Sequence, residues 1–376
     1  MPHYSVLIDG TAMPVDLGGV GRYVEGLLGA LDPLDLDLAV VVRPEHRQHV
    51  SDVAPGANVV VGPRWLRTKP LRFVWEQLGL PALARRLGSD VVHSPHYTFP
   101  LLRRRGSVVT LHDATFFSDP QWHSVTKRLF FTAWTRLALG SGRPCVVPSD
   151  ASAREFRRHV RRVRSTLTTT ALGVDFDVFH APGPDETAVF RAAHGLSDSE
   201  RWVAFLGTIE PRKNVGPLVR AHERLRRERE DVPTLLISGA RGWDDDAVAE
   251  LDRVAAQDAV RELGYLPLEQ LRSLLGAAEF VVYPSSGEGF GLPVLEALAC
   301  GACVLTTDRL SLPEVAGDAA DYSEPDEDAL LDALRRLVSD RARRDELRDR
   351  AIPRARLFTW AATADATLEA YREAAA

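Results

Sequence analysis

Short apolar runs alternate with helix-like stretches from one end of the chain to the other, and this alternation constrains the fold most strongly. Because the runs lack a polar face, each is expected to be a strand that is covered on both sides, as in parallel sheets between helical layers. The sequence therefore predicts an α/β protein. The expected strands are Ser5–Ile8, Leu38–Val42, Asp90–His93 and Ser107–Leu111 in the first half, and Trp202–Leu206, Thr234–Ser238, Phe280–Tyr283 and Cys303–Thr306 in the second.

The length of the chain, 376 residues, exceeds the usual size of one domain and predicts two. We expect an N-terminal domain over 1–175, a polar, Pro/Gly-rich linker over 176–185 and a second domain over 186–355. Doubly wound parallel sheets bind ligands beside the carboxyl ends of their strands. Two Rossmann-like domains of this kind, facing each other, would line one interdomain cleft.

The stretch Ser285–Glu296 combines a glycine-rich turn with two carboxylates, Glu288 and Glu296, eight residues apart. It follows an expected strand, while Pro293 suits the first turn of a helix and Gly301 marks that helix's end. A strand, a glycine loop and a helix N-terminus in series present free backbone N–H groups to an anion. Because the carboxylates can accept from hydroxyls, the segment suits a ligand with phosphate and several hydroxyls, such as a nucleotide sugar.

Seven motifs, in register along nearly the whole chain, resemble those of the retaining family 4 glycosyltransferases, which have the GT-B fold. The stretch Ser285–Glu296 matches the family's E-x7-E element, and Phe205–Asn214 matches its strand followed by E-P-R-K-N. The G-T-x-E-P-R-K-N and L-H-D forms are most similar to the enzymes that use GDP-mannose. The other five motifs are Gly18–Tyr23, Thr110–Asp113, Val147–Ser149, Leu172–Asp175 and Leu312–Val315.

The resemblance implies a metal-independent, retaining hexosyltransferase that acts in polysaccharide biosynthesis. It implies a mannosyltransferase in particular, with a lipid-linked or growing glycan as acceptor and no cofactor. GDP-mannose is the favoured donor and a UDP-sugar is the alternative. The resemblance also implies that the first domain holds the acceptor, that the second binds the nucleotide sugar, and that a final helix over 359–376 crosses back to the first domain. Its accepted mechanism is front-face attack, in which the leaving phosphate takes the acceptor's proton.

Arg212 and Lys213 follow an expected strand, where two cations could stabilise the charge on a departing diphosphate. The family motif favours this role over a solvated helix start, and it places Gly207 at the donor as well. Some members carry an arginine directly after that glycine. This chain has Thr208 there, which places more weight on the basic pair.

By resemblance, Glu296 accepts from the ribose hydroxyls and Glu288 contacts the transferred sugar. The alternative for Glu296 is a glutamate on a helix surface. The other residues that the resemblance assigns to the donor are Gly289, Phe290, Gly291 and Leu292 in the glycine-rich turn, together with Tyr265 and Leu266, whose backbone would read the base.

Four residues of the first domain are candidates for the site. Gly18 and Gly19 would let the backbone approach the diphosphate, or they form only a tight turn. The resemblance places His112 at the reacting sugar, with a structural histidine as the alternative. Asp113 could orient the acceptor hydroxyl or cap the next segment, and the sequence favours neither. The stretch 93–97 ends another strand and is a candidate part of the acceptor pocket.

The two halves of the chain differ in charge. Residues 1–170 contain 22 Lys/Arg and 14 Asp/Glu, a net +8, whereas the rest contains 24 and 38, a net −14. The basic runs 157–164 and 103–105 form either a solvated surface or a region attracted to an anionic membrane or a pyrophosphate-bearing acceptor. Nucleic acid is not expected as a partner, because no aromatic residues interleave with the basic ones.

Apolar runs stay short of the ~20 residues that span a bilayer, and the N-terminus lacks a signal-peptide pattern. With only three cysteines, the chain is expected in the reducing cytoplasm, with peripheral contact at the inner face of the membrane as a further hypothesis. We interpret Cys300 and Cys303 as small apolar side chains. Asp244–Asp246 resembles the D-x-D metal site of another fold but is better explained as an acidic helix start, so no metal is expected.

Two other functions stay open at the level of sequence. A nucleotide-sugar 2-epimerase shares the two-domain architecture but would not explain E-P-R-K-N together with E-x7-E. A non-catalytic nucleotide-sugar-binding subunit is disfavoured, because His112, Arg212, Lys213, Glu288 and Glu296 are all present.

Overall fold

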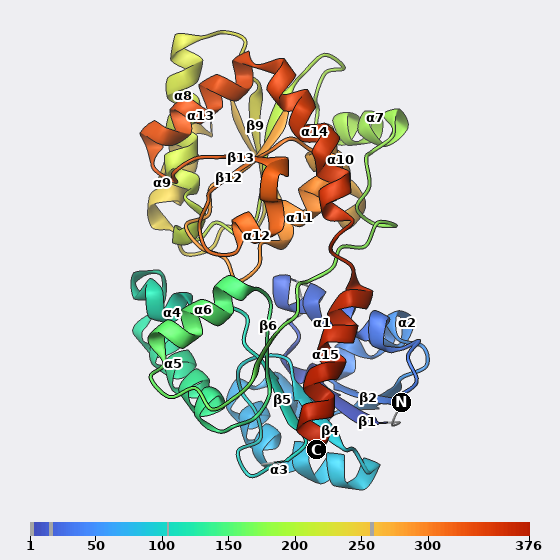
Figure 1. The fold of residues 1–376 in the computed structure, drawn as a ribbon. Coiled ribbons are helices and arrows are strands. Elements are labelled where there is room, and N and C mark those ends of the chain that lie inside the picture. The colour runs from blue at the N-terminus through green and yellow to red at the C-terminus, as the bar shows by residue number, and fades with distance from the viewer. Residues whose placement is uncertain (1–3, 15–17, 104, 256–258) are drawn as a thin grey trace. The chain divides into compact units, whose positions relative to one another are not determined.

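The computed structural model describes residues 4–14, 18–103, 105–255 and 259–376. The chain forms two compact units (Figure 1), of which the first comprises Met1–Gly173 with Thr359–Ala376 and the second comprises Val174–Phe358. The residues expected as a linker, 176–185, therefore belong to the second unit. Their last two residues begin helix α7 (Pro184–Ala193), because proline at the first position and a side-chain cap from Glu186 favour a helix start there.

The first unit contains a seven-stranded sheet in the order β3-β2-β1-β4-β5-β6-β7. Every described strand pair is parallel, and Val6 of β1 lies opposite Leu38 of β2 and Val91 of β4. The order reverses between β1 and β4, which makes these two strands the switch point of the sheet. The strands are β1 (Ser5–Asp9), β2 (Asp37–Val42), β3 (Asn58–Val61), β4 (Val91–Ser94), β5 (Ser107–Thr110), β6 (Cys145–Val147) and β7 (Leu167–Thr169).

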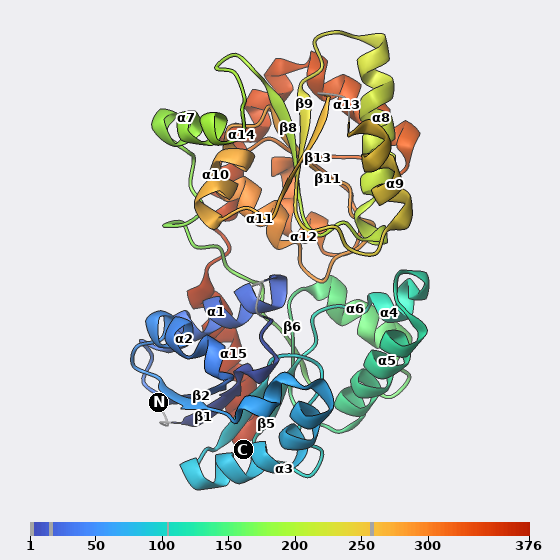
Figure 2. The ribbon, with the colours of Figure 1, turned by 180° about the vertical axis from the view of Figure 1, so that it is seen from behind.

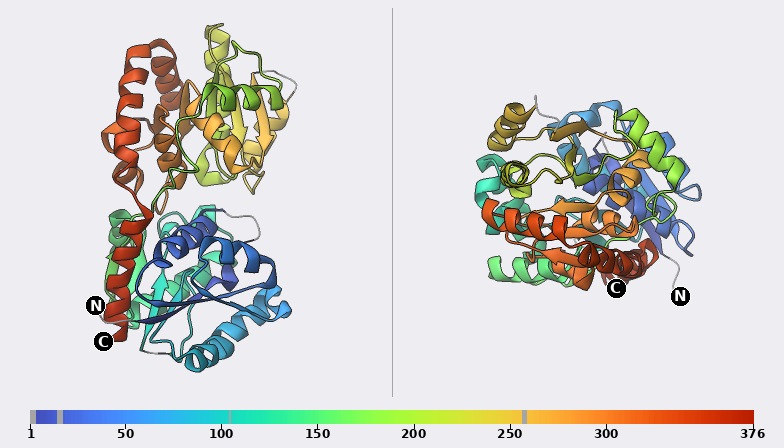
Figure 3. Two further views of the ribbon diagram at one scale, coloured as in Figure 1. Left: turned by 90° about the vertical axis from the view of Figure 1, so that its right-hand side faces the viewer. Right: turned by 90° about the horizontal axis from the view of Figure 1, so that it is seen from above.

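Helices cover both faces of this sheet, and Figures 1 and 3 show α15 and α3 on opposite sides of it. On one face, Tyr371 of α15 hydrogen-bonds His93 at 2.7 Å, and Tyr23 of α1 hydrogen-bonds Thr110 at 2.8 Å. On the other face, α3 and α5 pack on the apolar side chains of the strands. The helices are α1 (Gly19–Leu31), α2 (Arg47–Val53), α3 (Lys69–Leu87), α4 (Thr115–Ser118), α5 (Val125–Gly140), α6 (Asp150–His159) and α15 (Trp360–Ala375), with 3₁₀ turns η1 (Gly10–Ala12), η2 (Pro44–His46), η3 (Arg64–Arg67) and η4 (Pro120–Trp122).

The second unit contains a six-stranded parallel sheet in the order β10-β9-β8-β11-β12-β13, whose switch point lies between β8 and β11. Helices α8, α9 and α13 lie on one side of it and α10, α11 and α14 on the other (Figures 1 and 2). The strands are β8 (Trp202–Leu206), β9 (Thr234–Ser238), β10 (Val260–Gly264), β11 (Phe280–Tyr283), β12 (Val304–Thr306) and β13 (Ala320–Tyr322). After α7, the helices are α8 (Val215–Glu228), α9 (Asp245–Val254), α10 (Leu268–Gly276), α11 (Leu292–Ala299), α12 (Leu312–Ala316), α13 (Glu327–Ser339) and α14 (Arg341–Ala355), with η5 (Pro211–Lys213) and η6 (Gly317–Ala319).

The two doubly wound parallel sheets expected from the sequence are confirmed, and all eight expected strands are present with ends within one residue. Five strands were not expected: β3, β6, β7, β10 and β13. None of the helices in the described ranges is both long enough and apolar enough to span a membrane.

Candidate active site

Two loops that carry motif residues leave the switch-point strands β8 and β11 of the second sheet. After β8, Gly207 turns the chain with a φ of 148°, a conformation that favours glycine. The turn η5 then presents Arg212 and Lys213, and α8 begins after Asn214, which has a φ of 53°. After β11, the second loop carries Glu288 to the same carboxyl edge of the sheet.

The basic pair converges on one carboxylate oxygen. Lys213 Nζ lies 2.5 Å from Glu288 Oε1, and the Arg212 guanidinium forms an ion pair with the same oxygen. Arg212 also lies 2.6 Å from Glu210 Oε1 and donates to the carbonyl of Gly287 at 3.0 Å. Two cations and two carboxylates thus balance at this point, so an entering anion would meet cations that are already held in place.

Two hydroxyls also contact the carboxylate of Glu288. Tyr283, the last residue of β11, donates to Glu288 Oε1 at 2.7 Å, and Ser285 donates to it at 2.8 Å. Lys213 also donates to the Tyr283 hydroxyl, and its ammonium lies 4.3 Å from the centre of that ring. Because Tyr283, Ser285 and Lys213 are all buried, this network fixes the side chains within the protein rather than at its surface.

Burial and charge shift the pKa values of this group in defined directions. Burial, together with the neighbouring Arg212, lowers the pKa of Lys213 to about 8, although Glu288 and Glu210 act in the opposite sense. Burial alone would raise the pKa of Glu288, but the charges of Arg212 and Lys213 outweigh it and lower that pKa to about 2. Lys213 is therefore mostly charged at neutral pH, and Glu288 stays ionised.

Side chains from three segments hold the two loops together. Asn214 donates to the carbonyl of Pro284 at 2.8 Å and to the Ser286 hydroxyl at 2.7 Å, which ties the β8 loop to the β11 loop. From a third segment, Ser311 donates to the carbonyls of Glu288 at 2.9 Å and Phe290 at 2.8 Å. The glycine-rich turn is therefore fixed from both sides.

Helix α11 begins after Gly291, whose φ of 108° favours glycine, and it has Pro293 in its first turn. It ends at Ala299, with Gly301 at a φ of 72° just beyond, as expected. Glu296, one turn into the helix, is 2 % exposed, so it is not a glutamate on a helix surface. In the same region Phe290 and Leu292 are buried, and Gly289 is half-buried.

At the edge of the same sheet, β10 ends at Gly264, and the next two residues differ in their exposure to solvent. Tyr265 is 64 % exposed, whereas Leu266 is buried. Gly264 itself has a φ of 67°, and its carbonyl accepts from Gly239 at 2.8 Å and from Ser238 at 3.0 Å. The backbone at this corner is therefore well fixed beside an exposed aromatic ring.

In the first unit, His112 follows β5 at the carboxyl edge of the sheet. Its Nε2 lies 2.7 Å from the carbonyl of Pro95, which can only accept, so Nε2 carries the hydrogen. Burial lowers the pKa of His112, so the ring is neutral at pH 7 and Nδ1 is an acceptor. The ring packs edge-on against Tyr23, with centroids 5.2 Å apart.

Asp113 caps the segment that follows it. Its Oδ1 accepts from the Thr115 backbone N–H at 2.9 Å and from the Thr115 hydroxyl at 2.6 Å. Its backbone is held by the Tyr97 hydroxyl, which accepts from Asp113 N at 2.8 Å. The capping contact expected for Asp113 is therefore present, and its role at the acceptor stays a prediction.

Gly18 is the N-cap of α1 with an ordinary φ of −72°, and Gly19 is the first residue of the helix. A Cβ at either glycine would meet no atom of the described residues within 4 Å. Neither backbone strain nor packing therefore explains glycine at both positions, which fits a surface that a ligand approaches closely.

The residues of the expected acceptor stretch, 93–97, lie in two different environments. His93 is fully buried between Tyr371 and Thr110, and burial lowers its pKa to about 3, so it is a neutral part of the core. His96 and Tyr97 are nearer the carboxyl edge, where their rings pack with His112 at 5.8 and 5.9 Å.

Two structural interpretations are confirmed: the acidic helix start at Asp244, and Cys300 and Cys303 as buried small side chains. Asp244 is the N-cap of α9, where its side chain accepts from Ala247 N at 3.1 Å. Cys300 and Cys303 are buried free thiols at the end of α11 and the start of the next strand, and burial raises the pKa of each.

The sequence of this chain matches two family patterns. Residues 17–178 match the one described as "Glycosyltransferase Family 4", and residues 186–358 match "Glycosyl transferases group 1". The O-antigen chain mannosyltransferase B of Escherichia coli is 33 % identical over 314 residues, which cover 82 % of each chain. The chain belongs to glycosyltransferase family 4.

Solved structures of glycosyltransferases share the fold of this family 4 enzyme. Sucrose-phosphate synthase from Thermosynechococcus elongatus superposes with a TM-score of 0.76 at 20 % identity, over 99 % of both chains. The Anabaena protein HepE, solved in complex with UDP-glucose, gives a TM-score of 0.77 at 17 % identity, over 99 % of this chain and all of its own. The GT-B fold expected from the sequence is therefore confirmed.

Sequence reasoning missed several residues that contact the predicted site residues. Ser285 is the first residue of the recognised stretch, and Tyr283 ends the strand expected just before it. An apolar strand end and a loop serine gave no sign of a shared partner. Glu210 and Asn214 lay in the E-P-R-K-N motif without an assigned role. Ser311 directly precedes the L-P-E-V motif, which was the only signal that could have pointed to it.

Proposed function

We propose that this enzyme transfers mannose from GDP-mannose, with retention of configuration, to a hydroxyl of a lipid-linked or growing glycan. The observation that carries the proposal is the convergence of Arg212 and Lys213 on Glu288 at the switch point of the second sheet. Breaking the bond between a sugar and a nucleoside diphosphate places charge on the diphosphate, and two fixed cations stabilise that charge. Because Glu288 already orders both cations, little reorganisation is needed when the bond breaks.

The donor would bind along the carboxyl edge of the second sheet. Arg212 and Lys213 contact the diphosphate, and Glu296 accepts from the ribose hydroxyls. Glu288 accepts from a hydroxyl of the sugar, while the backbone N–H groups of the glycine-rich turn stabilise the phosphates at the start of α11. Backbone groups at Tyr265 and Leu266 read the base.

In the first unit, the neutral ring of His112 offers Nδ1 as an acceptor to the sugar, because Nε2 is used by Pro95. Gly18 and Gly19 let the start of α1 approach the diphosphate without a Cβ. Asp113 acts indirectly, since its carboxylate orders Thr115 and its backbone orders Tyr97. The leaving phosphate would take the proton of the acceptor hydroxyl.

Mannose is favoured over other hexoses by the Escherichia coli relative, which is named a mannosyltransferase and is 33 % identical over 82 % of both chains. A UDP-sugar is the alternative donor, because HepE was solved with UDP-glucose. HepE is only 17 % identical and supports the fold alone, so GDP-mannose remains the proposal.

A donor panel tests the proposal. Purified protein is mixed with GDP-mannose, UDP-glucose and the free nucleotides, and thermal shift, nucleotide release and the sugar product are measured. GDP-mannose should raise the melting temperature most, by mass action, and release GDP faster when a glycan acceptor is added. NMR of the product should show the α-anomer. Preference for UDP-glucose would show that GDP-mannose is not the donor. A sugar epimerised at C2 would indicate a nucleotide-sugar 2-epimerase, and binding without turnover would indicate a non-catalytic nucleotide-sugar-binding subunit.

A substitution tests the basic pair. Lys213→Ala should lower turnover by about 10²–10³-fold, as expected when one donor to a developing anion is lost. Lys69→Ala, on the exposed start of α3, is the matched control and should turn over like the wild type. Near-native turnover of the Lys213 variant would contradict the phosphate role.

A further inference from the structure

Helix α5 is apolar on both of its sides. Its inward side carries Trp134, Ala138 and Leu139 into the core of the first unit. Its outward side exposes apolar residues four positions apart, which places them in one stripe on the helix. Exposed apolar side chains gathered in one stripe, rather than scattered singly, indicate a surface that something else covers. We refer to it as the α5 face, defined by Val125, Leu129, Phe130, Ala133 and Leu137.

The exposure of these side chains is large. Val125 is 63 % exposed, Leu129 is 60 % and Leu137 is 50 %. Of the 15 large apolar side chains exposed among the described residues, 11 lie between residues 61 and 137. Scattered exposed apolar residues need no explanation, but this concentration in one part of one unit does.

A helix beside α5 also exposes apolar side chains. Phe73 of α3 contacts the rings of Phe130 and Trp134, with centroids 6.4 and 5.4 Å apart, so α3 lies beside α5. This helix exposes apolar residues of its own at i, i+3 and i+7. They are Leu71, Val74 and Leu78.

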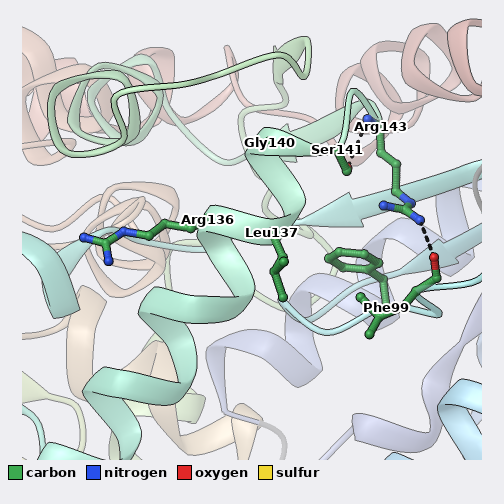
Figure 4. Close-up of a pocket in the computed structure, with 7 residues that line it drawn as sticks. Phe99, Arg136, Leu137, Gly140, Ser141 and Arg143 are labelled. Carbon is green, nitrogen blue, oxygen red and sulfur yellow. Dashed lines mark hydrogen bonds between the residues drawn. The ribbon is translucent and has the colours of Figure 1, made fainter.

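A cavity of about 450 Å³ lies at the C-terminal end of α5 (Figure 4). Phe99, Leu101 and Leu137 contribute its apolar lining, and the Arg143 guanidinium lies 4.5 Å from the centre of the Phe99 ring. Arg136 belongs to the same lining. The apolar stripe therefore ends in a hollow that has basic groups beside it.

The charged residues of the α5 segment have one sign. Residues 120–149 contain four Lys/Arg and no Asp or Glu. The basic run lies next to the end of α5, because the backbone N–H groups of Arg164 and Ser165 donate to the carbonyl of Leu139 at 2.7 and 3.1 Å. Arg161 and Arg162 in this run are exposed, and the nearest acidic residue of α6, Glu155, already pairs with Arg158 and His159.

We propose that the α5 face docks this enzyme on the surface of an anionic lipid bilayer. Apolar side chains that insert among acyl chains, flanked by bases that meet anionic headgroups, give the two contributions that hold a helix in the membrane interface. A second copy of the chain fits less well, because a twofold contact through this face would bring two basic surfaces together. The proposal is independent of the donor and goes beyond the transfer reaction.

Vesicle flotation tests the docking. The full-length enzyme is mixed with vesicles of phosphatidylcholine alone or with 30 % phosphatidylglycerol, and the bound fraction is measured at low and high salt. The wild type should float with the anionic vesicles and be released by salt. The double variant Leu129→Ser/Leu137→Ser should bind those vesicles at least about tenfold more weakly. The matched control Val189→Ser/Leu357→Ser removes two apolar residues of the second unit that are even more exposed, and it should bind like the wild type.

Two charge-reversal variants test the electrostatic contribution to vesicle binding. Arg161→Glu/Arg162→Glu should abolish binding to anionic vesicles, whereas Arg227→Glu/Arg341→Glu, with the same change in net charge, should not. Melting temperatures and turnover with a soluble acceptor should be unchanged in every variant, so a failure of docking is distinct from a failure of the proposed reaction. Absence of flotation, or equal binding by both leucine variants, would overturn the proposal. So would a dimer in solution that the Leu129→Ser/Leu137→Ser variant dissociates, because the face would then bind a second copy.

Discussion

Lys213 and Glu288 are 75 residues apart in the sequence and follow different strands, yet their side chains meet at 2.5 Å. The contact forms only where β8 and β11 lie side by side, at the point where the strand order of the second sheet reverses. Tyr283 and Ser285 donate to the same oxygen of Glu288. The group that would bind the diphosphate is thus assembled by the topology of the sheet.

The pH dependence of the reaction should report the protonation of Lys213. Burial lowers its pKa to about 8, so the ammonium is lost as the pH rises through that value. Because only the charged form attracts phosphate, kcat/KM for the donor should be level below pH 8 and fall about tenfold per pH unit above it. The measurement is initial rate at low donor concentration across the pH range.

Lys213→Arg provides the control for that assignment. A guanidinium stays charged throughout this range, so the alkaline limb should disappear even though the absolute rate is lower. Glu288 cannot produce an alkaline limb, because Arg212 and Lys213 hold its pKa at about 2 in spite of its burial. A wild-type profile that stays level to about pH 9.5 would show that Lys213 is not the titrating group.

Tyr283→Phe should lower turnover. The hydroxyl joins Lys213 to Glu288, and losing a buried hydrogen bond to a charged group costs about 1.5–3 kcal/mol, which corresponds to about 10–100-fold in rate. We expect the loss in kcat rather than in KM, because the hydroxyl positions the cation and does not touch the donor.

The control for Tyr283 is Tyr322→Phe. Its hydroxyl donates to the carbonyl of Gly317 at 2.6 Å, away from the basic pair, so this variant should keep its turnover. Equal rates for the two variants would remove Tyr283 from the site. Ser285→Ala should give a smaller loss than Tyr283→Phe, since it removes a donor from Glu288 but none of the contacts of Lys213.

The strands that sequence reasoning found and missed differ in a physical way. The eight found are buried on both faces, so they contain uninterrupted apolar runs. Four of the five missed, β3, β7, β10 and β13, are the outermost strands of the two sheets. Edge strands are partly exposed and tolerate polar residues, as in Val260-Arg261-Glu262-Leu263-Gly264. The fifth, β6, is buried and has three residues, the same length as β12, which was found, so its length does not explain the miss.

The site was predictable at positions where the backbone conformation requires glycine. Gly207 and Gly291 have positive φ values, and their loops were recognised. The partners of the charged groups were not predictable, because a contact such as Tyr283 with Glu288 depends on distances that no local pattern encodes. For Asp113 the sequence left two roles open; the structure shows the capping contact with the Thr115 N–H, and the acceptor role stays a prediction.

Glu296→Gln should weaken donor binding more than it slows the chemical step. The carboxylate is 2 % exposed within α11, and the amide keeps its size while removing its charge. Losing a charged acceptor for the ribose hydroxyls should weaken the affinity for free GDP by about tenfold, measured by calorimetry. Glu269→Gln, in the first turn of α10, is the control and should bind GDP normally. Unchanged affinity in the Glu296 variant would show that the ribose lies elsewhere.

Gly26→Ala should destabilise the first unit, because α1 and α15 approach closely at that glycine. A Cβ there would lie 2.1 Å from the Trp360 ring, which is too near for two atoms that are not bonded. The repacking that follows should cost about 2 kcal/mol in the free energy of unfolding, measured as a lower urea midpoint. Gly29→Ala lies one turn further along α1, where a Cβ meets only Val53 at 3.6 Å. Since alanine favours helix over glycine, this control should stabilise the protein by about 0.5–1 kcal/mol. If both variants unfolded at the same urea concentration, α15 would not be held against α1 at Trp360.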